Sequence, residues 1–311
     1  MTPLQIFARK KREQKPLAMV ALSDAPSAQI ACEAGIDALL VGDSLGNTVL
    51  GYDSTLPVTM DDMAHHLGAV VRGVKGSSRP DVPIIADLPF GSYSDPERGV
   101  ENAVRLMQIG AHAVKIEGTQ SGDGFEAGRV FELFKLAGVP VMGHLGFTPQ
   151  SVLQFESIVQ GKTAETALEL EEQAQLLVQA GCFAFVLEAT TEEVARHITQ
   201  NSPIATVGIG AGAGCDGQVL VWHDLVGISA KQFKLGRAFA PTREIWTQAL
   251  HDFQSEVENR TFPTPENGWT MPSEARAEWE KRRAERDEES AGFYEDHFET
   301  AKTEPLDEQP F

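Results

Sequence analysis

The sequence predicts an α/β protein built on a (β/α)8 TIM barrel, followed by an acidic C-terminal extension. Short apolar runs alternate with amphipathic helical stretches along most of the 311 residues. The runs recur at spacings of about 20 to 45 residues, which is typical of parallel strands joined by helical crossovers. Three helical stretches end at Gly110, Gly138 and Gly181, where a left-handed residue closes a helix. Eight such units close a barrel, and the chain is long enough for one.

Seven apolar runs are predicted to be strands, and an eighth is weaker. In chain order they span residues 16–22, 38–41, 82–88, 113–116, 140–142, 184–187 and 204–207, with the weaker one near Phe233. The clearest helical segments are residues 61–74, 95–110, 125–138 and 163–181. A doubly wound open sheet is the structural alternative, but it favours a GxGxxG turn after the first strand. The segment "ALSDAPSA" at residues 21–28 contains no such turn, so the barrel is favoured.

The composition limits the partners and the compartment. Lys and Arg number 26 against 45 Asp and Glu, a formal charge of -19, which repels nucleic acids and anionic membranes. Cys32, Cys182 and Cys215 form no CxxC pair, so neither a disulfide framework nor a thiolate zinc site is indicated. No stretch approaches the roughly 18 apolar residues of a membrane span. We therefore expect a cytoplasmic protein that acts on small molecules, with no nucleic-acid or membrane partner.

Ionisable side chains stand at the C-terminal ends of six consecutive predicted strands. They are Asp24, Asp43, Asp87, Lys115, Glu117, His144 and Glu188. In a barrel these ends share one rim, so the residues converge on a single pocket. Any one acid could be an ordinary turn or helix-cap residue. Their recurrence favours a functional site, because buried carboxylates are costly without a cation.

The type of cation follows from the ligands. Asp43, Asp87 and Glu117 offer only oxygen, which suits Mg²⁺ that keeps waters and binds substrate oxygens. His65 and His66 are adjacent on a predicted helix and point apart, so they are not expected to bind metal. Magnesium is therefore the predicted cofactor, and zinc is disfavoured.

Several longer strings have an unusual composition. They are "LVGDSLGNTVLGYDSTLPVT", "ADLPFGSY", "VKIEG", "VMGHLGFTPQS", "VQGK", "VLEA" and "GIGAGAGCDGQVLV". In this order and spacing they resemble the ketopantoate (3-methyl-2-oxobutanoate) hydroxymethyltransferase family of pantothenate biosynthesis, over residues 3–263. The resemblance implies a barrel of the phosphoenolpyruvate/pyruvate type in residues 1–263, with residues 264–311 as a separate extension.

The resemblance also implies which residues form the metal site. Asp43 of "GDS" and Asp87 of "ADLPF" correspond to magnesium ligands that also lie against the substrate. Glu117 of "KIEG" corresponds to a third ligand, bound directly or through a water. His144 is expected to contact these ligands without binding the metal itself.

Substrate binding and catalysis are assigned in the same way. Ser44 and Lys115 correspond to residues that hold the keto-acid substrate, and Glu188 of "VLEA" corresponds to the catalytic base. The implied reaction transfers a hydroxymethyl group from 5,10-methylenetetrahydrofolate to 3-methyl-2-oxobutanoate through a magnesium-bound enolate, giving 2-dehydropantoate. The co-substrate is thus a folate. The resemblance further implies a homo-oligomer, a decamer.

Two other functions are compatible with a barrel that carries acids at its rim. A magnesium-dependent C–C lyase or mutase of the phosphoenolpyruvate/isocitrate lyase type would resemble its relatives in a Lys-Cys-Gly loop after strand four. Residues 118–128 contain no cysteine. A non-catalytic paralogue would be expected to lose acids from the site, and all of them are present. The transferase is therefore the favoured function.

The sequence departs from the family pattern in a few places. Ser23 stands where a tyrosine is usual, Thr119 replaces a second glycine, and "VLQFESIVQGK" at residues 152–162 lacks a Gly-Gly-Tyr element. The glycine-rich segment 208–218 could cradle a phosphate. We favour instead a tight loop that closes the rim on the folate side.

The last 48 residues differ in composition from the barrel. Residues 264–311 hold 14 acids and 6 bases, a net charge of -8. Residues 272–292 are predicted to form a charged helix with opposite charges at i,i+4 spacing. The extension is expected to be partly helical or disordered. Its aromatic residues, including Trp269 and Trp279, suggest the alternative of docking on a neighbouring subunit.

Overall fold

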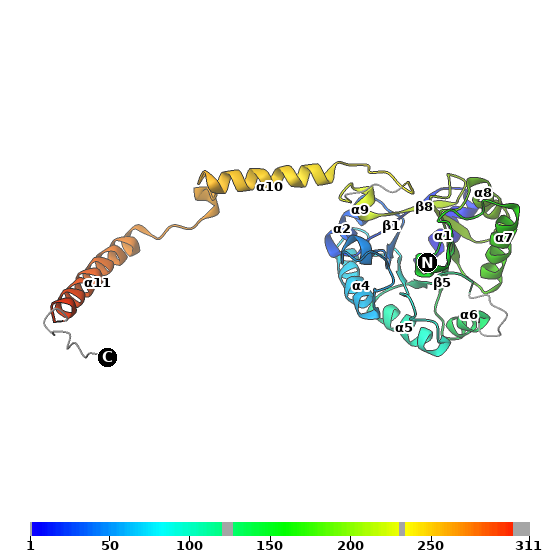
Figure 1. The fold of residues 1–311 in the computed structure, drawn as a ribbon, viewed down its shortest axis with the longest axis horizontal. Coiled ribbons are helices and arrows are strands. Elements are labelled where there is room, and N and C mark those ends of the chain that lie inside the picture. Colours follow the sequence, from blue (N-terminus) through cyan, green and yellow to red (C-terminus); the bar gives the residue numbers. More distant parts are fainter. Residues whose placement is uncertain (1, 120–126, 230–233, 301–311) are drawn as a thin grey trace, which may run out of the picture. The chain divides into compact units, whose positions relative to one another are not determined.

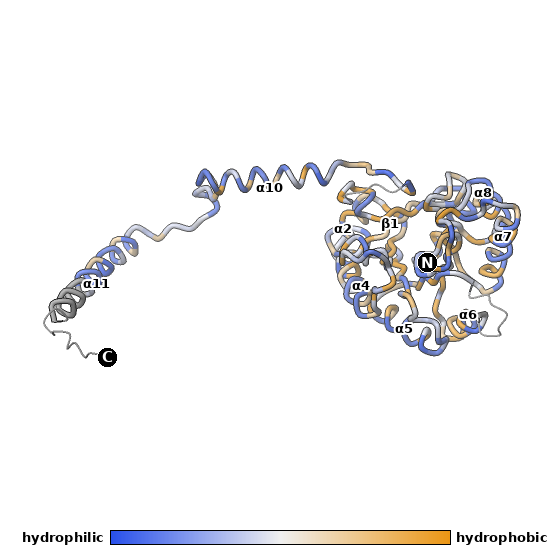
Figure 2. The backbone as a smooth tube through the Cα atoms, viewed as in Figure 1, coloured by the Kyte–Doolittle hydropathy of each residue, from blue (hydrophilic) through white to orange (hydrophobic). Residues whose placement is uncertain are grey.

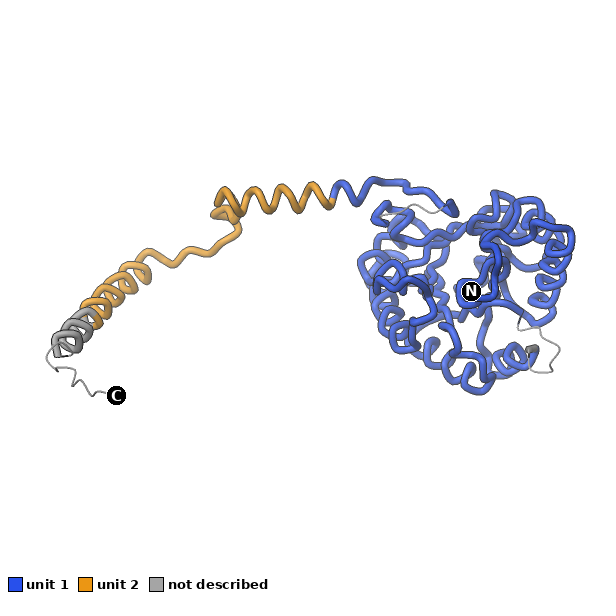
Figure 3. The backbone as a smooth tube through the Cα atoms, in the orientation of Figure 1, with its two compact units in different colours: residues 1–245 blue, residues 246–311 orange. Residues whose placement is uncertain are grey.

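The computed structural model describes residues 2–119, 127–229 and 234–300. The chain forms two compact units, residues 1–245 and residues 246–311 (Figure 3). The predicted boundary after residue 263 stays a prediction. None of the helices in the described ranges has the length and apolar character needed to cross a bilayer.

The first unit is a closed barrel of eight parallel strands in sequence order (Figure 1). The strands are β1 (Leu17–Ala21), β2 (Ala38–Val41), β3 (Ile84–Asp87), β4 (Ala113–Lys115), β5 (Val141–Gly146), β6 (Ala184–Glu188), β7 (Ala205–Ile209) and β8 (Gly217–Val221). The barrel closes where β1 pairs with β8, from Leu17 opposite Gly217 to Ala21 opposite Val221. The predicted fold class is confirmed. The predicted position of the eighth strand was wrong, because β8 begins at the end of the glycine-rich segment, at Gly217, while Phe233 lies outside the described residues.

One helix precedes the first strand, and the others follow the strands around the outside of the barrel (Figure 1). They are α1 (Gln5–Arg12), α2 (Ala25–Glu33), α3 (Leu45–Thr48), α4 (Met60–Lys75), α5 (Pro96–Ile109), α6 (Ala127–Leu136), the 3-10 helix η1 (Pro149–Gln154), α7 (Ala164–Gln179), α8 (Glu192–Asn201) and α9 (Trp222–Leu225). Their ends follow local rules: Thr59 and Thr163 form capping boxes at α4 and α7. Gly110, Gly138 and Gly181 have φ values of 134°, 72° and 86°, as predicted for residues that close helices.

The apolar residues form two layers, one inside the barrel and one between strands and helices. Figure 2 shows the hydropathy of each residue along the backbone, with many hydrophobic residues in the barrel. Strand β2 shows why there are two layers, since its side chains alternate between them. Leu39 and Val41 belong to the outer layer, and Leu40 between them belongs to the interior. The interior is therefore a packed core, and a site can form only at an end of the barrel.

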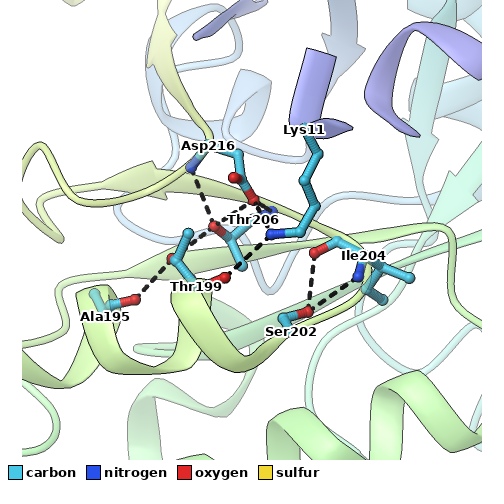
Figure 4. Close-up of polar contacts among 7 residues, drawn as sticks. All are labelled: Lys11, Ala195, Thr199, Ser202, Ile204, Thr206 and Asp216. Carbon is cyan, nitrogen blue, oxygen red and sulfur yellow. Dashed lines mark hydrogen bonds and ion pairs between the residues drawn. The ribbon is translucent and has the colours of Figure 1, made fainter. Parts of the chain in front are cut away.

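Helix α1 covers the N-terminal end of the barrel. Phe7 is 1% exposed and packs edge-on against Phe183, with 5.2 Å between ring centroids. Lys11 Nζ lies 2.7 Å from Asp216 Oδ2 and donates to the Thr199 carbonyl at 3.1 Å (Figure 4). Thr206 N also donates to Asp216 Oδ2, at 2.9 Å. This end is filled by packing and paired charges, so the opposite end is left for function.

The second unit comprises most of α10 (Thr242–Glu258), the 3-10 helix η2 (Pro265–Asn267) and α11 (Ser273–Thr300). Ion pairs one turn apart run along α11, as in Arg276–Glu280 at 2.9 Å and Arg282–Glu278 at 2.7 Å. Such exposed pairs are worth only about 0.3–0.5 kcal/mol each. Within this unit Phe253 packs edge-on against Phe262, with 5.6 Å between ring centroids, and Trp269 is 98% exposed.

Candidate active site

The C-terminal rim of the barrel gathers the predicted site residues into one buried cluster. Asp87 and Lys115 are register partners at the ends of β3 and β4, and neighbouring positions on parallel strands face the same side. Asp43 follows β2, and Glu117 lies two residues beyond β4. All four residues are at most 4% exposed. Residues far apart in the chain thus share one small volume at the rim.

Asp43 and Asp87 form the acidic centre of this cluster. The backbone N–H of Asp43 donates to Asp87 Oδ2 over 3.1 Å. A Cβ added at Gly42 would lie 3.2 Å from Ser44 Oγ and 3.4 Å from Asp87 Oδ2, so the Ser44 hydroxyl also faces this point. Burial and the neighbouring charges of Asp87 and Glu117 raise the pKa of Asp43 well above its usual range. The carboxylates around Asp43 therefore make its charged form less favourable than it is in water.

Lys115 is the buried cation beside this centre. Its Nζ lies 2.9 Å from Asp87 Oδ1 and 3.3 Å from His144 Nδ1. Burial alone lowers the pKa of Lys115, but the carboxylates of Asp87, Glu117 and Asp43 raise it above its usual value. Lys115 therefore stays an ammonium ion at neutral pH.

His144 connects Glu117 to Glu188. Its Nδ1 lies 3.4 Å from Glu117 Oε1, and its Nε2 lies 3.2 Å from Glu188 Oε2. Burial and the charge of Lys115 lower the pKa of His144, but its contacts with Glu117 and Glu188 raise it to about 9. His144 is therefore an imidazolium at neutral pH. The Glu188 side chain is 15% exposed, against 4% or less for His144 and Glu117, so Glu188 is more accessible to a substrate.

Gln150 and Tyr93 complete the cluster, and the sequence analysis assigned neither a role. The Gln150 side-chain amide donates to Asp43 Oδ2 at 2.8 Å and to the Leu88 carbonyl at 2.9 Å. Tyr93 Oη donates to Gln150 Oε1 at 2.7 Å and accepts from the Glu117 N–H at 3.2 Å. Because the Leu88 carbonyl can only accept, the orientation of the Gln150 amide is fixed.

Gln150 also holds Glu117 through its own backbone. Its N–H donates to Glu117 Oε2 at 2.9 Å, so one residue of η1 fixes two of the three predicted metal ligands. Burial raises the pKa of Glu117, but His144, Lys115 and this N–H lower it below its usual value. The strings "GSY" and "FTPQS" contain Tyr93 and Gln150, and they were the only sequence signal for this link.

Asp24 is the one predicted rim acid with an ordinary structural role. Its Oδ1 accepts from the Ser27 N–H at 2.8 Å and caps α2.

The glycine-rich segment 208–218 packs closely against α8. A Cβ at Gly212 would lie 2.4 Å from Glu192 Cγ, and a Cβ at Gly214 would lie 2.8 Å from Arg196 Cβ. Both contacts belong to the barrel wall.

The donor set fits a hard cation held by two carboxylates. Within the described ranges, no three His, Cys, Asp or Glu side chains are grouped as ligands of one ion. Glu117 contacts His144 through one oxygen and the Gln150 N–H through the other, which is compatible with the predicted binding through a water, beside Asp43 and Asp87. Two carboxylates, with water and substrate oxygens at the other positions, suit Mg²⁺. Burial, together with the carboxylates of Asp87 and Glu117, raises the pKa of Asp43, and a cation at this point would favour its charged form.

Comparison with known proteins gives a consistent result. A sequence model described as ketopantoate hydroxymethyltransferase matches residues 2–265. The chain is 47% identical to a 3-methyl-2-oxobutanoate hydroxymethyltransferase of Thermotoga maritima over 270 residues, covering 85% of this chain and 96% of that protein. It is 46% identical to a protein of the same name from Chloroflexus aurantiacus over 272 residues, covering 86% and 92%.

Solved structures with the same fold are more distant in sequence. A phosphonopyruvate hydrolase in complex with oxalate and Mg²⁺ superposes with a TM-score of 0.57 at 13% identity, covering 92% of this chain and 99% of that one. A 2,3-dimethylmalate lyase, described as a member of the PEP mutase/isocitrate lyase superfamily, gives 0.52 at 17% identity, covering 93% and 99%. These likenesses show the fold alone, a barrel of the kind predicted.

Proposed function

We propose, because the chain belongs to the ketopantoate hydroxymethyltransferase family, that it transfers a hydroxymethyl group from 5,10-methylenetetrahydrofolate to 3-methyl-2-oxobutanoate and forms 2-dehydropantoate. The observation that carries the proposal is the buried rim cluster. It places an accessible carboxylate, Glu188, beside cations and acids that suit a keto acid. The reaction needs a proton removed from C3 of the keto acid and a new C–C bond to the one-carbon unit.

In this proposal Asp43 and Asp87 would hold Mg²⁺, and Glu117 would bind it through a water. The bound ion would polarise the keto group and make the neighbouring C–H more acidic. Gln150 keeps one oxygen of Asp43 oriented by its hydrogen bond of 2.8 Å. Tyr93 and Gln150 together fix the spacing between Asp43 and Glu117.

Glu188 acts as the general base in this mechanism. Proton transfer by a positioned base contributes about 10²–10⁴-fold to a rate. His144 Nε2, 3.2 Å from Glu188 Oε2, orients the carboxylate and acts as a positioning residue. Lys115 contributes positive charge where the substrate oxygens become more negative, and the Ser44 hydroxyl donates to the keto acid.

Deuterium exchange at C3 of 3-methyl-2-oxobutanoate tests this proposal. The protein, loaded with Mg²⁺ in D₂O, should catalyse exchange without any folate and should form 2-dehydropantoate once methylenetetrahydrofolate is added. A protein that catalyses neither step does not have this function.

The proposal includes a homo-oligomer of this chain. Trp246, Leu250, Phe253 and Val257 repeat at spacings of three and four along one face of α10, and they are 57%, 67%, 54% and 46% exposed. A contiguous apolar face of this kind marks a contact surface. Light scattering that gave the mass of a monomer at micromolar concentration would contradict this part of the proposal.

A further inference from the structure

A pocket of about 550 Å³ opens next to the buried cluster. It is formed by the segment after β4, the end of β5, the 3-10 helix η1 and the first turns of α7. This volume lies within the range of about 300–1,000 Å³ that is usual for small-molecule sites. Most of the side chains in its wall are polar, so a ligand here would be recognised by hydrogen bonds.

The pocket adjoins the groups that carry the proposed chemistry. Glu117 is part of both the pocket wall and the buried cluster. Gly146, also in the wall, is the register partner of Glu188. A Cβ at Gly146 would lie 2.2 Å from the Glu188 backbone carbonyl oxygen, so only a glycine fits at this position. The pocket wall therefore includes the end of β5 that pairs with the end of β6, the strand that ends at Glu188.

The α7 side of the wall presents a defined set of polar groups. Thr166, Glu169 and Gln173 all line the pocket, and their spacing of three and four places them on one face of the helix. Glu169 offers two acceptor oxygens, and Gln173 offers both a donor and an acceptor. Phe155, which also lines the pocket, offers an aromatic ring whose centroid lies 5.5 Å from that of Phe147. The site can thus bind the edge and the face of a planar ring.

We propose that this pocket binds the pterin ring of the one-carbon donor, with Glu169 pairing with its 2-amino and N3–H edge. The inference rests on the proposed function, which requires a folate next to the keto acid. Two parallel N–H donors match a carboxylate bidentately, and Gln173 pairs with the remaining ring atoms. In this arrangement the ring stacks against Phe155.

The test compares Glu169→Gln with Glu172→Gln. Glu172 lies on the same helix, is exposed and is not part of the pocket wall. In Glu169→Gln an amide replaces one of the two acceptors, so the KM for methylenetetrahydrofolate and the Kd for tetrahydrofolate should each rise about tenfold or more. Glu172→Gln should keep the parent values. Equal folate constants in the two variants overturn the proposal.

Two further measurements sharpen the result. Tetrahydropterin, which lacks the aminobenzoyl-glutamate tail, should compete with methylenetetrahydrofolate in the parent and in Glu172→Gln, and weakly in Glu169→Gln. A lack of competition in the parent would show that the ring is not what the pocket recognises.

Folate-free exchange at C3 separates the pocket assignment from the proposed function, because its absence in the parent refutes the proposed function. Normal exchange with unchanged folate constants in Glu169→Gln refutes only the pocket assignment.

Discussion

The two ends of the barrel both contain charged side chains, but they balance them differently. At the N-terminal end Lys10 pairs with Asp37 at 2.6 Å and Lys11 pairs with Asp216 at 2.7 Å, one cation for each acid. At the C-terminal end four carboxylates surround two cations, Lys115 and His144. Balanced pairs neutralise each other within the fold, whereas an excess of carboxylates leaves negative charge that a bound cation can neutralise. The difference separates the structural end of this barrel from the end that binds ligands.

The largest expected effect comes from removing the metal. EDTA should abolish C3 exchange, because the ion that would make the C3 proton acidic is removed. Adding Mg²⁺ back to Asp43 and Asp87 should restore the exchange. Helix α1 and the N-terminal end should be unaffected, so near-UV circular dichroism should stay unchanged. Restoration by Zn²⁺ alone would show that the oxygen ligands are wrongly assigned.

Glu188→Gln should lower C3 exchange by about 10²–10⁴-fold. The substitution keeps the volume and a polar tip but removes the basic oxygen, so calorimetric binding of the keto acid should persist. Asp216→Asn at the opposite end is the matched control and should keep the parent exchange rate. Exchange at the parent rate in Glu188→Gln would show that Glu188 is not the base.

Lys115→Ala should weaken keto-acid binding by about 1.5–3 kcal/mol, the usual range for a hydrogen bond to a charged group. Folate binding should change little, because Lys115 lies beside Asp87 on the metal side of the cluster. Both affinities are measured by calorimetry with Mg²⁺ present. An equal loss of both would indicate a folding defect rather than a lost substrate contact.

His144 should make the stability of the metal-free protein depend on pH. Its pKa in the folded protein, about 9, is above the ordinary value of 6.5. Its charged form therefore stabilises the fold fully below about pH 6.5, and this contribution is lost as the pH rises through 9. Each unit of pKa difference corresponds to about 1.4 kcal/mol. Urea unfolding of the parent and of His144→Gln at several pH values should show a steeper decline for the parent, and parallel curves would contradict the assignment.

The smallest effect on activity is expected at the N-terminal end. Asp216→Asn weakens contacts with Lys11 and Thr206, so the free energy of unfolding should fall by about 1–3 kcal/mol. C3 exchange per folded molecule should stay at the parent rate. A large loss of exchange would show that the two ends are coupled, and the comparison between them would fail.

The strand and helix pattern predicted most of the barrel, because each element depends on local rules. The eighth strand escaped because glycine is rare in strands and marks close approach of another backbone. At Gly217 a Cβ would lie 2.6 Å from the Leu17 carbonyl oxygen, so barrel closure itself requires glycine there. That requirement is invisible without the partner strand.

The sequence by itself determined the fold class, the family and the residues that meet at the rim, since strand ends of a parallel barrel share one side. It also indicated the charged helix that the structure places at Ser273–Thr300. Only the tertiary structure decided how the rim residues pair. Gln150 and Asp43 are 107 positions apart, and His144 lies between Glu117 and Glu188 because adjacent strands bring them together. Such pairing depends on distances through space, which no local pattern encodes.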